Sequence, residues 1–384
     1  MVTGVYNPEI NGAANQCRLL VKALSGEINF SVLTTTRNPS LPLRSQIDHT
    51  KVYRILINSR GIINYCTAMI KIASVFLSRK ENFQIVHLHG FSLKSCLLTL
   101  LSKIFRKKVI IKMTSVGHDD PFSMKKRGFL LNYFFSRADY YVGVSPIFEK
   151  LYRQSQLPSN RFKLIPNGVD TNWFHPVLSS EKTMLRNQLG LPEKMKLILF
   201  VGHFSLEKSP YHLLNSWMKN VAKTYLETGI VFIGSTNPNH YEVDTQLVNE
   251  IKKMADYYFN EKIFFIEKTY EIEKYYQAAD IFAMPSSREG MPNALLEAMA
   301  CSPPVIVSRL EGITDWIISD GKNGLLFDPS IWDELGRAIN RILNDNALAE
   351  SLGKEARMTV VDKFSIDRVS AEYLKLYHRL IPSA

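Results

Sequence analysis

Cysteine is scarce in this 384-residue sequence, which contains only four. They are scattered through apolar surroundings, and none forms a C-x-x-C pair or a Cys/His pair at metal-ligand spacing: Cys17, Cys66, Cys96 and Cys301. This pattern disfavours both a zinc site and a disulfide framework. We therefore expect a protein of a reducing, cytoplasmic compartment.

Long hydrophobic runs are absent as well. The two longest apolar stretches, residues 62–77 and 97–105, are interrupted by Lys71 and Lys103. Neither reaches the roughly 18–20 residues that a membrane-spanning helix needs. No basic segment followed by an apolar core opens the chain, so we expect no signal peptide. These absences favour a soluble or peripheral protein.

Acidic residues are few in the first half of the chain. Residues 1–166 hold 24 Lys and Arg against 8 Asp and Glu, a net charge of +16, whereas the remainder holds 23 against 28, a net charge of −5. Basic clusters occur at residues 106–108 and 125–127. Such a half is typical of a domain that meets membrane headgroups, a phosphorylated substrate or nucleic acid. A solvated cationic face without a partner has the same composition.

The sequence does have a regular order of short β-branched runs and amphipathic stretches. Continuous apolar strands separated by helices predict parallel sheets covered on both faces. We expect strands at residues 29–34, 51–57, 84–88, 109–113, 140–144 and 163–165, and again at 197–201, 230–233, 262–266, 281–284, 305–307 and 324–327. In the first half, helical patterns lie at residues 14–24, 62–77, 93–105, 124–135 and 146–153.

The pattern breaks at residues 167–195, where proline and glycine are frequent and periodicity is weak. We therefore predict two doubly wound, Rossmann-like α/β domains, over residues 1–166 and 196–384, joined by a linker over residues 167–195. The last helical segment, residues 367–380, can pack on either domain. Because ligands of such sheets bind beyond the carboxyl ends of the strands, we expect the site in a cleft between the domains.

The most informative motif is residues 285–300, PSSREGMPNALLEAMA, since G-x-G-x-x-G and P-loop motifs are missing. Pro292 suits the first turn of a helix, whose N–H groups and positive dipole end suit a phosphate. Glu289, in the loop, and Glu297, about one and a half turns into the helix, flank this anion site. Carboxylates hold hydroxyls but cannot neutralise phosphate, which indicates a sugar-bearing ligand. A solvated loop acid and a capping interaction are the alternative.

Residues 285–300 resemble the E-x7-E signature of retaining glycosyltransferases of family 4, which have the two-domain GT-B fold. Five further segments agree with landmarks of that family in order and spacing, and the resemblance runs nearly end to end. These segments are PEINGAA at 8–14, IPNGVD at 165–170, FVGHFSLEK at 200–208, AADIFAMPS at 278–286 and DGKNGLL at 320–326. Each motif alone is weak, but six in register are specific.

The resemblance implies that the C-terminal domain holds a nucleotide-sugar donor. Glu297 would accept hydrogen bonds from the ribose, Glu289 would lie beside the donor sugar, and Lys208 would pair with the departing diphosphate. The remaining donor contacts would be Gly12, His203 and the backbone of Met291, Pro292, Asn293 and Ala294. The family usually has arginine where this chain has His203, and histidine cannot make the bidentate, permanently charged contact of arginine.

The acceptor would bind the N-terminal domain, where many members of the family place a histidine after the strand that corresponds to residues 109–113. His118 and Asp119 stand there, so the resemblance makes them acceptor contacts, with His118 as a third catalytic residue beside Glu289 and Lys208. The same residues also fit a solvated loop, and a metal site built from His118, Asp119 and Asp120 is a further alternative.

The reaction implied is the transfer of a hexosyl-type sugar from a nucleotide sugar, with UDP the commonest carrier, to an acceptor hydroxyl with retention of configuration. No metal or other cofactor is expected. The basic half favours a saccharide or lipid-linked saccharide acceptor at an anionic membrane surface, as in surface polysaccharide synthesis. The alternatives are a nucleotide-sugar epimerase or hydrolase on the same fold, and a basic nucleic-acid-binding protein. Against the last, no nucleic-acid-binding motif is present.

Overall fold

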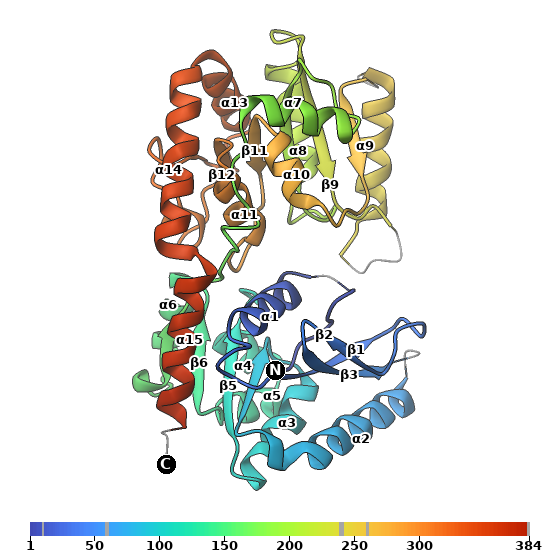
Figure 1. Ribbon diagram of the computed structural model, residues 1–384, viewed down its shortest axis with the longest axis vertical. Coiled ribbons are helices and arrows are strands. Elements are labelled where there is room, and N and C mark those ends of the chain that lie inside the picture. The colour runs from blue at the N-terminus through green and yellow to red at the C-terminus, as the bar shows by residue number, and fades with distance from the viewer. Residues whose placement is uncertain (10, 58–60, 238–241, 259–260, 382–384) are drawn as a thin grey trace. The chain divides into compact units, whose positions relative to one another are not determined.

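The structure is a computed structural model that describes residues 1–9, 11–57, 61–237, 242–258 and 261–381. The chain forms two compact units. The first comprises Met1–Gly168 together with the C-terminal segment from Ile366, and the second comprises Val169–Ser365 (Figure 1). The prediction of two parallel-sheet α/β domains is confirmed.

Two groups of strands make up the sheet of the first unit. In one, β1 (Ser31–Thr36) pairs in parallel with β3 (Thr50–Leu56), and β2 (Arg44–Ile47) adds an antiparallel edge that the sequence analysis missed. The other has the order β4 (Ile85–His89), β5 (Lys108–Met113), β6 (Tyr140–Gly143) and β7 (Phe162–Leu164), all parallel. Val2 bridges Leu33 and Leu88 and so joins the two groups.

Helices cover both faces of this sheet. On one face, α1 (Gly12–Ala23) packs against α15 (Ile366–Leu380), and Leu20, Ile110 and Tyr373 share their core. Since Tyr141 alternates with Tyr140 and Val142 of that core, it points to the other face, where it meets Phe135 of α5 (Phe129–Phe135). The other helical segments of the first unit are α2 (Ile62–Arg79), η1 (Lys80–Asn82), α3 (Leu93–Ile104), α4 (Pro121–Lys126), α6 (Pro146–Gln154) and η2 (Ser159–Arg161).

Two details differ from the sequence-based expectations. The single helix expected over residues 124–135 is divided into α4 and α5, because Gly128 adopts a φ of 116°, which an L side chain rarely tolerates. The terminal helix α15, which the sequence left open to either domain, belongs to the first unit. Val369 and Tyr373 bury their side chains there beside Tyr140 and Ile165.

The second unit has a six-stranded parallel sheet in the order β10-β9-β8-β11-β12-β13. Its strands are β8 (Lys196–Val201), β9 (Thr228–Ile233), β10 (Ile263–Ile266), β11 (Ile281–Met284), β12 (Val305–Ser308) and β13 (Leu325–Phe327). From β8 the chain builds outward through β9 and β10, then returns to β11 on the other side of β8. The strand order therefore reverses between β8 and β11, which is the topological switch point of a doubly wound sheet.

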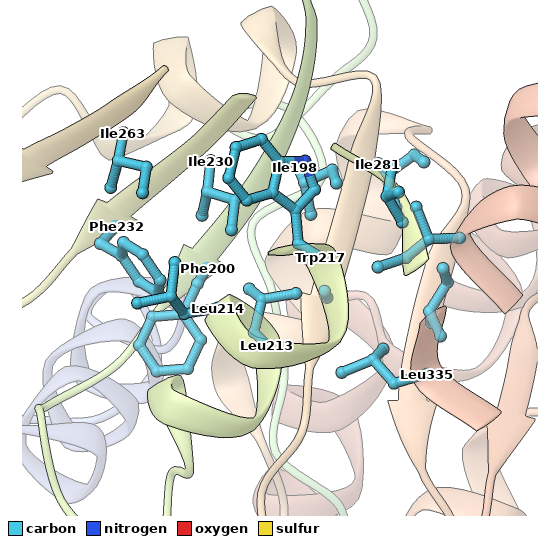
Figure 2. Packing of buried hydrophobic residues seen from close by; sticks show 14 of the residues in the cluster. Ile198, Phe200, Leu213, Leu214, Trp217, Ile230, Phe232, Ile263, Ile281 and Leu335 are labelled. Carbon is cyan, nitrogen blue, oxygen red and sulfur yellow. The ribbon is translucent and has the colours of Figure 1, made fainter. Parts of the chain in front are cut away.

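Helices of the second unit precede, connect and follow these strands. They are α7 (Ser179–Gln188), α8 (Pro210–Asn220), α9 (Thr245–Tyr258), α10 (Ile272–Ala278), α11 (Asn293–Cys301), α12 (Thr314–Ile317), α13 (Glu334–Asn344) and α14 (Asn346–Phe364). Trp217 of α8 is fully buried against Ile198 and Ile230, and its indole N–H donates to Thr228 Oγ1 at 3.1 Å (Figure 2). This packing holds the central strand β8, and with it the loop that follows.

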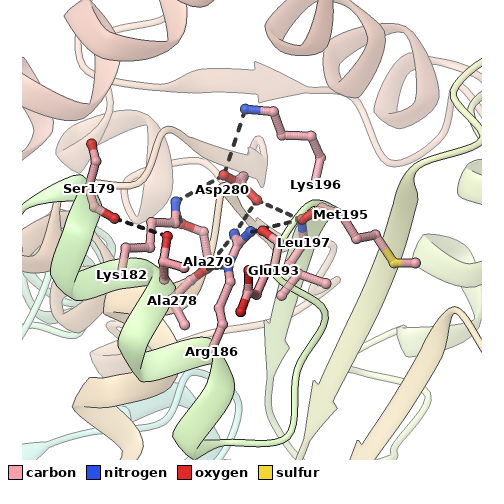
Figure 3. Close-up of polar contacts among 11 residues, drawn as sticks. Ser179, Lys182, Arg186, Glu193, Met195, Lys196, Leu197, Ala278, Ala279 and Asp280 are labelled. Atoms are coloured by element: carbon pink, nitrogen blue, oxygen red, sulfur yellow. Dashed lines mark hydrogen bonds and ion pairs between the residues drawn. The ribbon is translucent and has the colours of Figure 1, made fainter.

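Residues 169–195, expected within a linker, are part of the second unit. Lys182 and Arg186 of α7 both form ion pairs with Asp280, which stands just before β11 (Figure 3). Asp280 also accepts a hydrogen bond from the backbone N–H of Leu197 at 2.8 Å. The Asp280 carboxylate thus joins α7, β8 and β11. Residues 169–195 are therefore held in the second unit, and not in a linker, by contacts between residues about a hundred positions apart.

Candidate functional site

The loops that follow β8 and β11 leave the sheet on either side of the switch point. Because β8 and β11 are neighbouring parallel strands, their carboxyl ends lie at the same edge of the sheet. Gly234, after β9, is needed there, since a Cβ at this position would meet the carbonyl oxygen of Gly202 at 1.9 Å. The structure thus brings segments 202–208 and 285–292 together, where ligands of doubly wound sheets bind.

Several contacts connect these two segments. The backbone N–H of Ser287 donates to the carbonyl of Glu207 at 2.7 Å, and Arg288 forms an ion pair with the Glu207 carboxylate at 2.6 Å. Deeper in the loop, Lys208 Nζ lies 2.6 Å from Glu289 Oε1. The side chain of Glu289 is only 8% exposed, whereas that of Lys208 is 32% exposed. A half-buried cation therefore neutralises a buried carboxylate at the mouth of the switch point.

Helix α11 begins beside this ion pair. It starts at Asn293, with Pro292 in the N-cap position, one residue later than the sequence predicts. The amides at the start of a helix have no carbonyl partner within it, and the helix dipole makes this end positive. Met291 and Pro292 are buried, while Asn293 and Ala294 are partly exposed. Lys208 and the start of α11 therefore place positive charge on both of the neighbouring segments, 202–208 and 285–292. This arrangement suits an anionic ligand group.

Glu297 lies in the second turn of α11 and accepts a hydrogen bond from the Tyr276 hydroxyl at 3.0 Å. Desolvation raises the pKa of the Glu297 carboxyl to about 7, and the bond from Tyr276 offsets part of that rise. Tyr276 is itself fully buried on α10. Tyr276 was not among the residues predicted for the site, since nothing in its local sequence pattern distinguishes it from a core aromatic residue.

The raised pKa of Glu297 predicts a pH-dependent cost to folding. The folded protein retains this proton up to about pH 7, whereas the unfolded chain releases it near its ordinary pKa of 4.5. Stability is therefore lost as pH rises from about 4.5 to 7. The variant Glu297→Gln keeps an acceptor for Tyr276 without the charge. Its stability relative to the wild type should improve by about 2 kcal/mol between pH 5 and pH 8, a value that allows for partial exposure.

Urea unfolding of both proteins across this pH range checks the prediction. The difference between them isolates Glu297 from every other titrating group. A difference that does not change with pH would show that Glu297 titrates near its ordinary pKa.

His203 and Gly12, the other expected donor contacts, have distinct surroundings. His203 follows β8, and its Nε2 lies 3.2 Å from a Glu242 carboxylate oxygen. Gly12 is the first residue of α1 in the first unit, where the Asn11 side chain caps the helix by accepting from the N–H of Ala14 at 2.7 Å. Ile10, from the same motif, lies outside the described residues.

The expected acceptor loop follows β5 in the first unit. His118 is exposed, whereas Asp119 is buried and closes the loop by accepting hydrogen bonds from the backbone N–H groups of Thr114 and Ser115 and from the Thr114 hydroxyl. Burial raises the pKa of Asp119 to about 6. The two neighbours differ in kind: His118 faces solvent, and Asp119 shapes the loop that carries it.

Neither a metal site nor a membrane span is evident in the described part of the chain. Across those residues, no three His, Cys, Asp or Glu side chains are grouped to hold a metal ion. Asp120, the remaining residue of the alternative metal site, caps α4 through the backbone N–H of Ser123 at 2.9 Å. Among the helices described, none is both long enough and apolar enough to cross a membrane.

Both units match known protein families. The glycosyltransferase family 4 model matches residues 10–173, and the model for glycosyl transferases group 1 matches residues 181–359. An uncharacterised glycosyltransferase of Methanocaldococcus jannaschii is 25% identical over 98% of this chain and 97% of its own length. The UDP-Gal:alpha-D-GlcNAc-diphosphoundecaprenol alpha-1,3-galactosyltransferase of Escherichia coli is 26% identical over 56% of this chain and 54% of its own.

Solved structures share the fold. Sucrose-phosphate synthase from Thermosynechococcus elongatus superposes with a TM-score of 0.83 at 21% identity, covering 100% of this chain and 98% of that one. HepE of Anabaena, in complex with UDP-glucose, superposes with a TM-score of 0.79 at 16% identity and covers 98% of both chains. By family match in each unit and by the names of its relatives, the chain is a glycosyltransferase, and it has the GT-B fold.

Proposed function

We propose that this protein transfers a hexosyl-type sugar from a UDP-sugar to a saccharide or lipid-linked saccharide acceptor, with retention at the anomeric carbon. The observation that carries the proposal is the arrangement at the switch point of the second unit. There, Lys208 is paired with Glu289 beside the start of α11, and Glu297 stands one turn further along the same helix. Lys208 and the positive start of α11 suit a diphosphate, Glu289 suits the hydroxyls of a sugar, and Glu297 suits those of a ribose.

The proposed roles follow from charge. In transfer, the bond between the anomeric carbon and the diphosphate oxygen breaks, the acceptor hydroxyl oxygen forms the new bond to that carbon, and the hydroxyl proton passes to the departing diphosphate. Negative charge grows on the departing diphosphate, which Lys208 and the amides at the start of α11 stabilise. Glu289, released from Lys208, accepts hydrogen bonds from sugar hydroxyls, and Glu297 accepts them from the ribose. We assign no resident cofactor, since the nucleotide sugar is a co-substrate.

The acceptor is assigned to the first unit. His118 is exposed on the loop after β5, where groups at the carboxyl end of a strand meet ligands in this fold class, and it can hydrogen-bond to an acceptor hydroxyl. The E. coli relative named above acts on a sugar joined to diphosphoundecaprenol. A lipid-linked acceptor at the cytoplasmic face of a membrane also agrees with the basic first half. Release of nucleoside diphosphate with no sugar acceptor would instead favour an epimerase or hydrolase.

A thermal-shift titration with UDP, GDP and ADP tests the donor site. A ligand that binds only the folded state at about 100 times its Kd stabilises by about 2.7 kcal/mol. For a unit of this size, that corresponds to an increase in Tm of about 5–10 °C. We expect this increase with UDP alone and its loss in Glu297→Ala.

The matched control is Glu250→Ala, an exposed glutamate on α9, which should keep the full increase. An equal increase in Glu297→Ala would show that the nucleotide binds elsewhere. An increase only with GDP or ADP would refute the assignment of UDP while retaining the site.

A further inference from the structure

One surface of the first unit is both apolar and basic. Helix α2 carries Ile63, Ile70 and Leu77 at intervals of seven residues, so they lie along one side of the helix. Ile63 is 81% exposed and Ile70 is 70% exposed, so this stripe faces solvent. The opposite side of α2 is buried, with Ala68, Ile72 and Phe76 in the core. An amphipathic helix would normally present polar residues where α2 presents isoleucine.

The neighbouring helices continue the stripe. Helix α3 packs between α2 and α5, and α2 and α3 lie side by side (Figure 1). On α3, Leu93, Leu100 and Ile104 are exposed at helical spacing. On α5, Phe129 is 82% exposed and Leu130 is also exposed. Three adjacent helices therefore direct large apolar side chains outward. A single exposed apolar residue is common on a protein surface, but a group of them indicates an interaction site.

Positive charge is concentrated in the segment that carries these apolar residues. Residues 61–137, which contain all of α2 to α5, hold 13 Lys and Arg against 3 Asp and Glu, a net charge of +10 out of +11 for the whole chain. Two of the three acids, Asp119 and Asp120, are buried within their loop, and one of the cations, Lys112 on β5, is buried as well. Lys125 and Lys126 end α4 and Arg127 follows them, and all three are exposed two to four residues before Phe129. We call this surface of α2, α3, α4 and α5 the apolar–basic face.

We infer that the apolar–basic face binds the surface of an anionic lipid bilayer. Exposed lysine and arginine attract acidic headgroups, while Phe129, Leu130 and the isoleucines of α2 enter the boundary between headgroups and acyl chains. Nucleic acid would use the charge but leave the aliphatic side chains in water. A second copy of the chain would bring two strongly positive faces together. Of these occupants, only an acidic bilayer complements both properties.

The face is also joined to the loop of His118. Arg127 Nη1 donates to the carbonyl oxygen of His118 at 3.0 Å, and α4 begins immediately after Asp120. A bilayer against α4 and α5 would therefore lie next to this loop. If the loop receives the acceptor, which rests on the proposed function, a lipid-linked saccharide would reach it without leaving the membrane. Binding to the bilayer itself does not depend on that function.

Co-sedimentation with vesicles tests the inference. We expect the full chain to pellet with vesicles of phosphatidylglycerol and phosphatidylcholine, but not with phosphatidylcholine alone. Raising the salt from about 0.05 M to about 0.5 M should weaken binding, because screening shortens the reach of the lysine charges. The charge-reversal variant Lys125→Glu/Lys126→Glu and the apolar variant Phe129→Ser/Leu130→Ser should each lower the partition coefficient at least about tenfold.

Matched controls lie on the second unit. Lys194→Glu/Lys354→Glu changes net charge equally, and Leu226→Ser/Tyr257→Ser removes two equally exposed apolar side chains. Both should bind vesicles as the wild type does. All substituted residues are exposed, so an unchanged Tm and an unchanged response to UDP should show that each variant is folded. If the wild type binds vesicles but UDP does not raise its Tm, that result would count against the proposed donor site and not against the membrane-binding face.

Three results would overturn the inference. One is equal binding to neutral vesicles, and another is the absence of vesicle binding. The third is a concentration-dependent dimer, lost in Phe129→Ser/Leu130→Ser, which would make the face an interface between copies.

Discussion

Replacing Lys208 with alanine should lower the rate of sugar transfer about 10²–10³-fold. In the folded protein, Lys208 Nζ lies 2.6 Å from Glu289 Oε1 and is the cation of the ion pair at the mouth of the switch point. Removing a group that stabilises charge growing in a transition state typically costs about 3–4 kcal/mol. If Lys208 meets the departing diphosphate, the loss falls mainly on kcat, since the charge is greatest as the bond breaks.

This substitution also leaves a buried carboxylate without its cation, so its effect on folding needs a separate control. Glu289 is 8% exposed on its side chain, and an unpaired charge there destabilises the loop. The double variant Lys208→Ala/Glu289→Gln removes both charges and should recover stability without recovering transfer. Steady-state kinetics and urea unfolding of the two variants, beside the exposed control Lys194→Ala, separate these effects. Full transfer in either Lys208 variant would refute its assigned role.

Replacing Asp280 with alanine should lower the free energy of unfolding of the second unit by about 3–5 kcal/mol, the usual cost of removing one partner of a buried ion pair. Arg186 is buried and would lose its counter-charge, Lys182 would lose a contact of 2.9 Å, and the N–H of Leu197 would lose its acceptor (Figure 3). Because Asp280 joins α7, β8 and β11, the loss should spread to the loops of the candidate site.

The pH dependence gives this prediction a second measurement. Burial raises the pKa of Asp280, but the charges of Lys182 and Arg186 outweigh it, and the pKa is lowered overall. The stabilisation is therefore complete above the ordinary pKa of an aspartate and is lost as pH falls through the lower, folded value. Urea unfolding should show the gap between wild type and Asp280→Ala narrowing in acid. Glu193→Ala, an exposed acid nearby, should change stability little. A loss below about 1 kcal/mol in Asp280→Ala would mean that the cluster contributes no net stability.

Much of the fold is visible in the sequence because local patterns carry it. The expected strand at residues 281–284 matches β11 at both ends, and the others shift by one or two residues, as from 109–113 to β5 at Lys108–Met113. Buried parallel strands produce continuous apolar runs, and these survive in any tertiary context. The short edge strand β2 was not predicted, since three of its four residues are polar and the strand pairs only on one side.

The candidate site is only partly predictable from the sequence, because local motifs identify single residues but not their distant partners. Glu289, Glu297 and Lys208 were identified through motifs, and the structure brings Lys208 and Glu289 together although 81 positions separate them. The hydrogen bond from Tyr276 and the pairing of Glu207 with Arg288 had no local signal. Contacts of this kind depend on which loops the sheet order makes neighbours.

The sequence by itself determined the two α/β domains and the concentration of positive charge in the first half, since periodicity and composition carry these properties. Its motifs carry the resemblance to a glycosyltransferase family. Only the tertiary structure decided that α7 belongs to the second unit and α15 to the first, because Asp280 and Tyr373 find their partners across long sequence separations. It also decided that Ile63, Ile70 and Phe129 are exposed beside the basic residues. Periodicity shows that a helix has an apolar side, but only packing decides whether that side meets the core or the solvent.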